Sequence, residues 1–365
     1  MTAPVTAAGG PACAERDERL DPRLGPVLAQ VRVEPGGLRA TVAGRTLSAD
    51  TARALRRELV GALYEEFHAG HAFEEDIGGR SLREPRFEQR LAACVPHTTT
   101  PVRAQQPTAG GGQGAGVAVV DGLRVRLPGK DGGPGPDRER EPGVVREPGV
   151  VRMPASRPGL SPGFFLVDGS RGRPSGGPLL RLYVHLDDAD EAVAAWGRTL
   201  RTLEAAGVRY RAKVSSAERL LPRRDGLVVY LGEDAWHVVP SLAERVPSAA
   251  KAGRTGLSPA FARVLTAGVC LAWEPEDGRP GRRHLSFGQH RAAAVADALL
   301  EHATAGPAPA AAPLGDLLVR RLRESGIEPA ALHRNLNSPE VPEIGERVPA
   351  HTRISGKSFA RTPEE

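Results

Sequence analysis

The sequence predicts an α+β fold, in which an antiparallel or mixed sheet packs against helices. Residues 180–186 and 208–214 alternate apolar and polar side chains, as half-buried strands do. A helix is expected between them, over residues 188–206. Two short apolar runs at 117–127 flank Asp121–Gly122, which is a strong signal for a β-hairpin.

Further elements follow from the same patterns. In the N-terminal region, apolar residues recur every three or four positions after a cap at Asp50 or Thr51 and up to Phe67, which predicts an amphipathic helix. Beyond residue 220 we expect strands at 226–231 and 269–273, and helices near 234–246, 286–303 and 314–325.

Composition divides the chain into three parts. Residues 1–100 form an N-terminal helical region, residues 101–306 the main domain with its Pro/Gly-rich linkers, and residues 307–365 a short helix and a disordered tail. The 365 residues include 43 Gly and 33 Pro, which is typical of globular parts joined by loose segments.

Several functional classes are not expected. No apolar run is long enough to span a membrane, and the N-terminus has no secretory signal. Three widely spaced cysteines fit a reducing cytoplasm, and a dispersed net charge of +5 argues against a nucleic-acid partner. His68 and His71 have a spacing that can bind metal on a helix but lack a third ligand, so neither a metal nor a cofactor is predicted.

Lys213 is the most informative residue. Only four of the 49 basic Lys and Arg residues are lysine, and of these only Lys213 lies within a predicted strand. A lysine can lose its proton when positive neighbours or desolvation favour the neutral amine, whereas an arginine cannot. Lysine at this point therefore suggests a role for a free amine; the alternative is a chance lysine on a solvated strand face.

The polar faces of the two strands suggest an anion site. If strands 180–186 and 208–214 pair, they present Arg181, Tyr183, His185, Arg209, Arg211 and Lys213 on one surface. Neither strand contains an acidic residue, and arginine forks suit a phosphate dianion. His290 and Arg291 begin a later helix, where amide groups also favour an anion. A simply solvated charged face remains the alternative.

Residues from about 116 to 305 resemble the HopA-type effector family. Besides the hairpin at 117–127, the motifs that carry the resemblance are Ser161-Pro-Gly-Phe-Phe165, Leu180-Arg-Leu-Tyr-Val-His-Leu186, Ala206-Gly-Val-Arg-Tyr-Arg-Ala-Lys213, Arg223-Arg-Asp-Gly-Leu-Val-Val-Tyr230, Leu265-Thr-Ala-Gly-Val269 and Ser286-Phe-Gly-Gln-His-Arg291. Some family members accompany a separate kinase-like protein in lanthipeptide and thioamide-peptide pathways. The resemblance implies that such members eliminate phosphate from phosphoserine or phosphothreonine.

The strand plan is also similar to that of phosphothreonine lyases, which use a lysine base, a histidine acid and phosphate-binding Arg and Lys residues. Carried over, Lys213 matches the base, and Arg181, Arg224 and Arg291 match phosphate ligands. Those lyases have Lys-x-His where this chain has Arg181-x-Tyr183. The role of the acid is therefore open among Tyr183, His185 and His290, with His290 slightly favoured.

The expected function is that of a cytoplasmic phosphoserine/phosphothreonine lyase acting on a phosphorylated precursor peptide. Lys213 would remove the α-proton, and Arg181, Arg211, Arg224 and Arg291 would bind the phosphate. The product would be dehydroalanine or dehydrobutyrine, and a kinase-like protein of the same pathway is an expected partner. The alternative is a non-catalytic scaffold with the same fold that binds a phosphopeptide or a partner enzyme.

Overall fold

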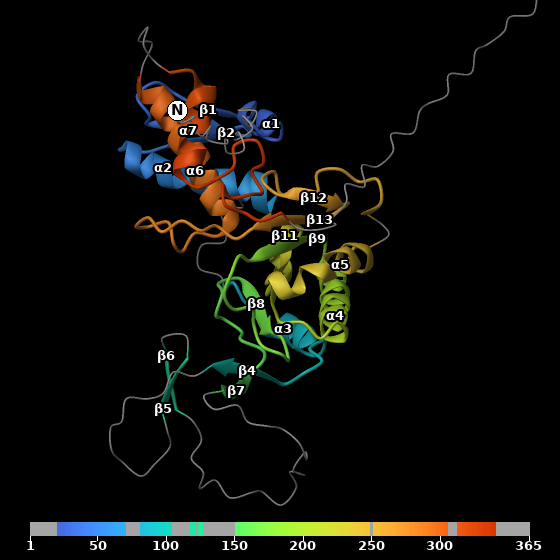
Figure 1. The fold of residues 1–365 in the computed structure, drawn as a ribbon. Coiled ribbons are helices and arrows are strands. Elements are labelled where there is room, and N and C mark those ends of the chain that lie inside the picture. Colours follow the sequence, from blue (N-terminus) through green and yellow to red (C-terminus); the bar gives the residue numbers. More distant parts are fainter. Residues whose placement is uncertain are drawn as a thin grey trace, which may run out of the picture.

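A six-stranded antiparallel sheet forms the centre of the computed structural model, which describes residues 20–70, 81–103, 117–120, 123–126, 150–248, 251–305 and 312–340. Its strand order is β12-β13-β9-β11-β10-β8 (Figure 1). The strands are β8 (Phe164–Asp168), β9 (Leu180–Leu186), β10 (Tyr210–Ser215), β11 (Arg223–Leu231), β12 (Arg263–Thr266) and β13 (Val269–Trp273).

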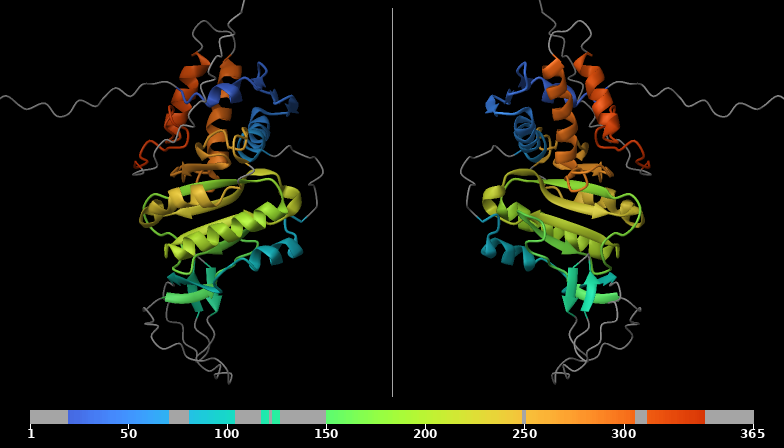
Figure 2. Two further views of the ribbon diagram at one scale, coloured as in Figure 1. Left: turned by 90° about the vertical axis from the view of Figure 1, so that its right-hand side faces the viewer. Right: turned by 90° about the vertical axis from the view of Figure 1, so that its left-hand side faces the viewer.

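Helices cover both faces of this sheet, which confirms the predicted α+β class (Figure 2). One face carries α3 (Pro85–Ala92), α4 (Ala189–Ala205) and α5 (Val239–Arg245). The opposite face carries α2 (Ala52–Tyr64), α6 (Phe287–Ala305) and α7 (Leu314–Glu324). As a result every residue of the central strand β9 is buried, so its polar side chains need partners inside the protein.

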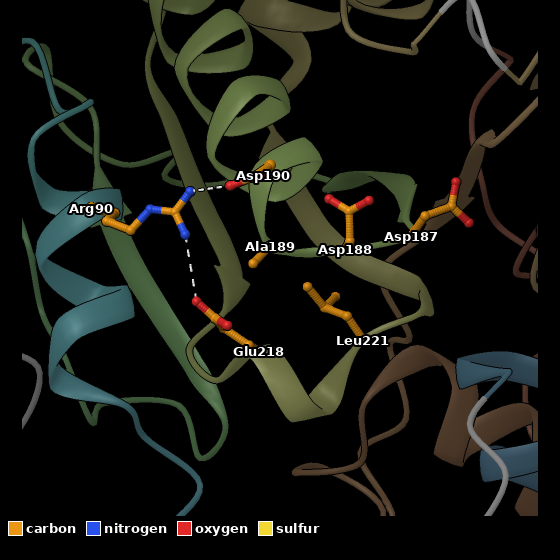
Figure 3. A pocket seen from close by; sticks show the side chains of 7 residues that line it. All are labelled: Arg90, Asp187, Asp188, Ala189, Asp190, Glu218 and Leu221. Carbon is orange, nitrogen blue, oxygen red and sulfur yellow. Dashed lines mark hydrogen bonds and ion pairs between the residues drawn. The ribbon is translucent and has the colours of Figure 1, made fainter.

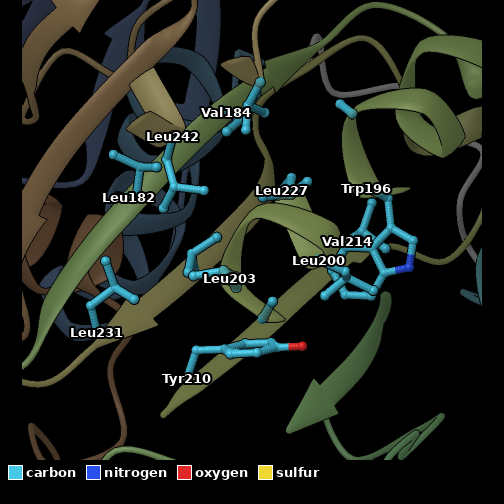
Figure 4. Packing of buried hydrophobic residues seen from close by; sticks show 14 of the residues in the cluster. Leu182, Val184, Trp196, Leu200, Leu203, Tyr210, Val214, Leu227, Leu231 and Leu242 are labelled. Carbon is cyan, nitrogen blue, oxygen red and sulfur yellow. The ribbon is translucent and has the colours of Figure 1, made fainter. Parts of the chain in front are cut away.

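The α4 side holds the larger apolar core (Figure 4). The side chains of alternate strand residues, such as Leu182, Leu227 and Val214, pack there against Trp196 and Leu200 of α4. The N-terminus of α4 is capped by Asp188, whose carboxylate accepts from the Glu191 amide at 2.9 Å. This helix agrees with the prediction for residues 188–206.

The opposite side combines the N-terminal region with the C-terminal helices. Leu55, Leu59 and Leu63 of α2 share a buried cluster with Phe287 and other residues of α6. Thr51 caps α2 as predicted, by accepting from the Ala54 amide at 3.1 Å. The helix itself ends at Tyr64 and continues as a π-helical turn, Glu65–Ala69.

Several short elements were missed by the sequence patterns because their runs are too brief to show a period. They are α1 (Leu24–Leu28), the sheet of β1 (Val31–Val33), β2 (Arg39–Val42) and β3 (Arg45–Ser48), and the ribbon of β4 (Thr99–Arg103) with β7 (Val150–Pro154). Helix α3 and strands β8 and β12 were also missed.

The predicted hairpin is confirmed as β5 (Val117–Val120) paired with β6 (Leu123–Arg126). Its turn at residues 121–122 lies outside the described residues. The sequence predicted a disordered tail directly after the helix at 314–325, which is wrong for residues 326–340, where Ile327 and Leu332 are fully buried. The rest of the predicted tail, from residue 341 onward, lies outside the described residues. None of the helices in the described ranges is both long and apolar enough to cross a membrane.

Strands β9 and β10 do not pair with each other, contrary to the arrangement considered from the sequence. Strand β11 lies between them and pairs with both. Its register places Arg211, Tyr230 and Arg181 in one row across the three strands, and Lys213, Val228 and Tyr183 in the next row. Because cross-strand neighbours point to the same face, the polar residues still share one side of the sheet.

Arg291 connects α6 to the chain segment that follows α7. Its side chain is fully buried, and its Nε donates to the carbonyl of Leu332 at 2.9 Å. Its Nη2 donates to the carbonyl of Arg334 at 2.9 Å and to Oδ1 of Asn335 at 2.8 Å. Burial lowers the pKa of this guanidinium to about 9, so it remains charged at neutral pH. We infer that Arg291 has a structural role.

Buried histidines make a second internal feature of the fold. Burial lowers the pKa of His68 from its ordinary value of 6.5 to about 4, and burial with the neighbouring charge of Arg291 lowers that of His290 to about 4. Both rings are therefore neutral at pH 7. The His68 ring lies between the rings of Tyr64 and Tyr183, with centroid separations of 5.4 and 5.2 Å.

Replacing Arg291 by lysine is expected to lower the free energy of unfolding by about 3 kcal/mol, because one ammonium group cannot satisfy the buried carbonyl groups that the guanidinium reaches. Thermal and urea unfolding would measure this. Arg320→Lys is the matched control, since Arg320 lies on the surface and its ion pairs should contribute less than about 1 kcal/mol. An Arg291→Lys protein as stable as the control would contradict the structural role.

The depressed histidine pKa values predict acid sensitivity. Below about pH 6.5 an unfolded histidine binds a proton that the folded ring excludes until about pH 4, so stability falls across that window by about 1.4 kcal/mol per pH unit for each histidine. His68→Phe removes one such group and keeps the aromatic stacking. Urea unfolding between pH 7 and 5 should then show a shallower pH dependence; an unchanged slope would refute this assignment.

Candidate functional site

Three of the predicted site residues line one pocket. Arg181, Arg211 and Lys213 meet in a cavity of about 350 Å³ on the α6 side of the sheet. The remaining lining residues come from the segments before β8 and β9 and from the neighbouring strands: Leu160, Ser161, Leu166, Arg173, Pro174, Leu179, Tyr230 and Glu274. The lining therefore combines cationic and apolar side chains with the carboxylate of Glu274.

Lys213 differs from the other pocket cations in its surroundings. Its Nζ lies 4.1 Å from the centroid of the Phe164 ring, and the side chain is partly buried. Within the described ranges no hydrogen bond or ion pair to this ammonium group is found. The ammonium group of Lys213 thus contacts an aromatic face, whereas no carboxylate lies within hydrogen-bonding distance of it among the described residues.

Two of the three arginines that line the pocket, Arg211 and Arg181, are paired with carboxylates. Arg211 donates to Asp168 through Nε at 2.6 Å and Nη2 at 3.0 Å, and Asp168 is fully buried. Arg181 donates through Nε and Nη2 to the two oxygens of Glu274, and its guanidinium lies 4.9 Å from the centroid of the Tyr230 ring. Glu274 keeps 28% of its side chain exposed.

These ion pairs contradict the expectation that the cations on the two predicted strands lack acidic partners. The sequence showed no acidic residue on strands 180–186 and 208–214, and we expected their cations to lack partners. The carboxylates come from elsewhere: Asp168 ends β8, and Glu274 follows β13. Because β8 and β13 lie on either side of the strands that carry the arginines, only the sheet order reveals these partners.

Two predicted phosphate ligands lie elsewhere. Arg224 donates to the carbonyl oxygens of Glu66 at 2.7 Å and Gly256 at 2.9 Å, which fixes it against the end of the N-terminal helix. Arg291 is the buried connection described above. Neither residue lines the pocket.

The predicted histidines also lie outside the pocket lining. His290 is held on both sides: its Nε2 lies 3.0 Å from Asp277, and its Nδ1 accepts from Arg291 at 2.9 Å. His185 lies 2.9 Å from Asp187, and burial lowers its pKa. Its carbonyl accepts from Lys251, a buried lysine that also pairs with Glu191 at 2.7 Å.

Tyr183 contacts the pocket residue Arg181. The side chain is buried, and its hydroxyl oxygen accepts from Nη1 of Arg181 at 3.5 Å. Burial raises the pKa of the phenol well above its usual range, although the charge of Arg181 opposes this. Tyr183 is therefore adjacent to a pocket residue but is not itself among the lining residues.

A buried polar cluster lies next to Phe164. It includes Arg223, whose guanidinium carbon lies 5.0 Å from the centroid of the Phe164 ring. Asp225 accepts from Arg223 at 2.5 Å and from the Tyr64 hydroxyl at 3.1 Å, and His68 lies 3.8 Å from it. Burial alone would raise the pKa of Asp225, but the charge of Arg223 keeps it well below its ordinary range. Nothing in the sequence pattern indicated that the N-terminal helix would reach this cluster.

Tyr230 and Glu274 are pocket residues that the sequence analysis did not select. Tyr230 could have been found, because Leu227, Val229 and Leu231 alternate toward the opposite face of the same predicted strand. Glu274 gave no such signal, since its position depends on the pairing of β13 with β9, in which Ala272 faces Arg181.

A second pocket, also of about 350 Å³, has a different character (Figure 3). It is lined by Asp187, Asp188, Asp190 and Glu218 around Arg90, which reaches Asp190 and, at 3.4 Å, Glu218. Asp188 is the cap of α4, so these acids serve a helix N-terminus and surface ion pairs. No cluster in the described residues has the composition of a metal site, and His71 lies outside them.

The sequence and structure were compared with those of known proteins. The profile of the HopA1 effector protein family matches residues 155–334. The match begins after the β5–β6 hairpin, which the resemblance in sequence had included. It extends beyond residue 305 and includes Leu332 and Arg334, whose carbonyls accept from Arg291. No curated protein gave a significant match.

Two solved structures are similar to part of the chain. The effector protein from Pseudomonas syringae pv. syringae strain 61 has 15% identity and a TM-score of 0.34, and that from Pseudomonas syringae pv. tomato strain DC3000 has 17% identity and a TM-score of 0.36. Each alignment covers 47% of this chain and 62% of the effector, less than two thirds of its length. Through residues 155–334, the chain belongs to the HopA1 effector protein family.

Proposed function

We propose that this protein is a phosphoserine/phosphothreonine lyase that acts on a phosphorylated precursor peptide. The observation that supports this most directly is the pocket in which Lys213, without a carboxylate partner among the described residues, lies beside Arg181 and Arg211. Elimination needs a base for the α-proton and cations for the phosphate, and this pocket supplies both types of group.

In the proposed reaction the phosphate binds between the guanidinium groups. Arg211 is oriented by the buried carboxylate of Asp168, which stays in place. Arg181 is paired with Glu274, whose partly exposed side chain can turn away and leave the fork to a phosphate dianion. The substrate thus replaces one internal anion, and the cost of opening that ion pair favours ligands with more charge than a carboxylate.

The neutral amine of Lys213 then removes the proton from the substrate α-carbon. The electrons of that C–H bond form the Cα=Cβ double bond, and the Cβ–O bond breaks toward the phosphate. Leu160, Pro174 and Leu179 at the rim suit contact with the peptide around the phosphorylated residue. The product is a dehydroalanine or dehydrobutyrine residue.

The proposed setting is cytoplasmic peptide modification, in which a separate kinase-like protein phosphorylates the precursor. The competing function is a scaffold that binds the phosphopeptide without converting it. The pairing of Arg181 and Arg211 with carboxylates is compatible with that alternative, because arginines can bind a phosphate without any reaction. Binding alone also requires no free amine at Lys213. The two functions differ in what Lys213 must do.

Lys213→Arg is expected to abolish elimination while phosphopeptide binding is retained, since an arginine keeps the charge but cannot act as the base. The purified full chain would be incubated with a phosphothreonine peptide and followed by intact mass. Wild type should remove the mass of phosphoric acid. Arg209→Lys is a control, because Arg209 lies on the surface, pairs with Asp234 and does not line the pocket.

Equal turnover by wild type and Lys213→Arg would exclude Lys213 as the base. Binding without any loss of mass by wild type would exclude the lyase function and leave the scaffold.

A further inference from the structure

We propose that Tyr230 is the proton donor to the departing phosphate, an inference that rests on the proposed lyase function. Tyr230 lines the pocket with Lys213, Arg181 and Arg211. In the sheet it stands between the two arginines, opposite Arg211 on one side and Arg181 on the other. Cross-strand neighbours have Cβ atoms roughly 5 Å apart, so a phosphate held by both arginines lies within reach of this side chain.

The other groups in the pocket are poorer donors. Among the described residues, no histidine lines the pocket. Both carboxyl oxygens of Glu274 accept hydrogen bonds from Arg181, so they act as acceptors in this structure. The hydroxyl of Ser161 is a much weaker acid than a phenol. Of the lining side chains, Tyr230 therefore offers the most suitable neutral O–H group.

The donors considered from the sequence are less well placed. His290 has both ring nitrogens engaged by Asp277 and Arg291, and His185 is paired with Asp187. Tyr183 shares a row of the sheet with Lys213, but its side chain is buried and its hydroxyl oxygen accepts from Arg181. None of the three is among the residues that line the cavity.

Arg181 links phosphate binding to this proton transfer. Its guanidinium lies 4.9 Å from the centroid of the Tyr230 ring. A cation at that distance stabilises the negative phenolate that remains after donation. In this proposal the same arginine binds the phosphate and contacts the ring of the proton donor.

The step balances without a co-reactant. Lys213 takes the α-proton and becomes an ammonium group, while the Cβ–O bond breaks with its electron pair on the phosphate oxygen. That oxygen takes the phenolic proton of Tyr230, so hydrogen phosphate leaves and a phenolate remains. Transfer of the proton from the Lys213 ammonium to the phenolate, directly or through water, restores both groups.

Tyr230→Phe tests this assignment, because phenylalanine keeps the ring beneath Arg181 and removes only the hydroxyl. We expect kcat on a phosphothreonine peptide to fall by roughly 10²-fold or more. The affinity for a matching peptide with a non-eliminable phosphonate should stay within about threefold of wild type, as expected when a hydroxyl acts in the chemical step. The control is Tyr210→Phe, since Tyr210 lies on the other face of the sheet and its hydroxyl donates to Glu204.

A second measurement keeps the test decisive if Tyr230→Phe folds poorly. A difluorotyrosine incorporated at position 230 has a more acidic phenol and nearly the same shape. It should move the alkaline limb of the pH–rate profile to lower pH, whereas a purely structural tyrosine would leave that limb in place.

The outcomes separate this inference from the function on which it rests. Turnover by Tyr230→Phe that matches wild type, or a loss that appears in Tyr183→Phe and not in Tyr230→Phe, would overturn the role of Tyr230 and leave the lyase intact. If wild type binds the phosphopeptide and never eliminates phosphate, the lyase function itself fails.

Discussion

Covering the sheet on both faces is the constraint on which the rest of this structure depends. With α4 on one side and α2 and α6 on the other, a charged side chain on a central strand cannot be satisfied by bulk water. The structure meets this requirement by pairing Arg181 with Glu274, Arg211 with Asp168 and Arg223 with Asp225. In the candidate site Arg181 and Arg211 are thus paired with carboxylates, whereas no ion pair of Lys213 is found among the described residues.

This constraint also explains why arginines in similar sequence contexts have different roles. Arg291 is fully buried and its donors are taken by backbone carbonyls, Asn335 and His290, so it stabilises the fold. Arg181 is paired with Glu274, whose side chain is partly exposed, and in the proposed function a substrate phosphate replaces that carboxylate. The two arginines differ in how deeply the groups that they bind are buried. Those groups come from distant segments of the chain, so the local sequence does not show their burial.

The sequence predicted those features that depend on short-range pattern. The alternation of 180–186 and 208–214 gave the correct shared face for Arg181, Arg211 and Lys213, and the cap at Thr51 was found. Strand order was not predictable, because β11 enters between β9 and β10 although it follows both in the chain. The carboxylates of Asp168 and Glu274, the distant positions of Arg224 and Arg291, and the contribution of Tyr64 and His68 all follow from that tertiary arrangement.

The central claim is that the pocket removes an α-proton and does not merely hydrolyse the phosphate ester. A phosphothreonine peptide deuterated at the α-carbon distinguishes the two reactions. The account predicts that phosphate and deuterium are lost together and that turnover is slower than with the protium peptide. Release of phosphate with the deuterium retained in a threonine product would contradict it.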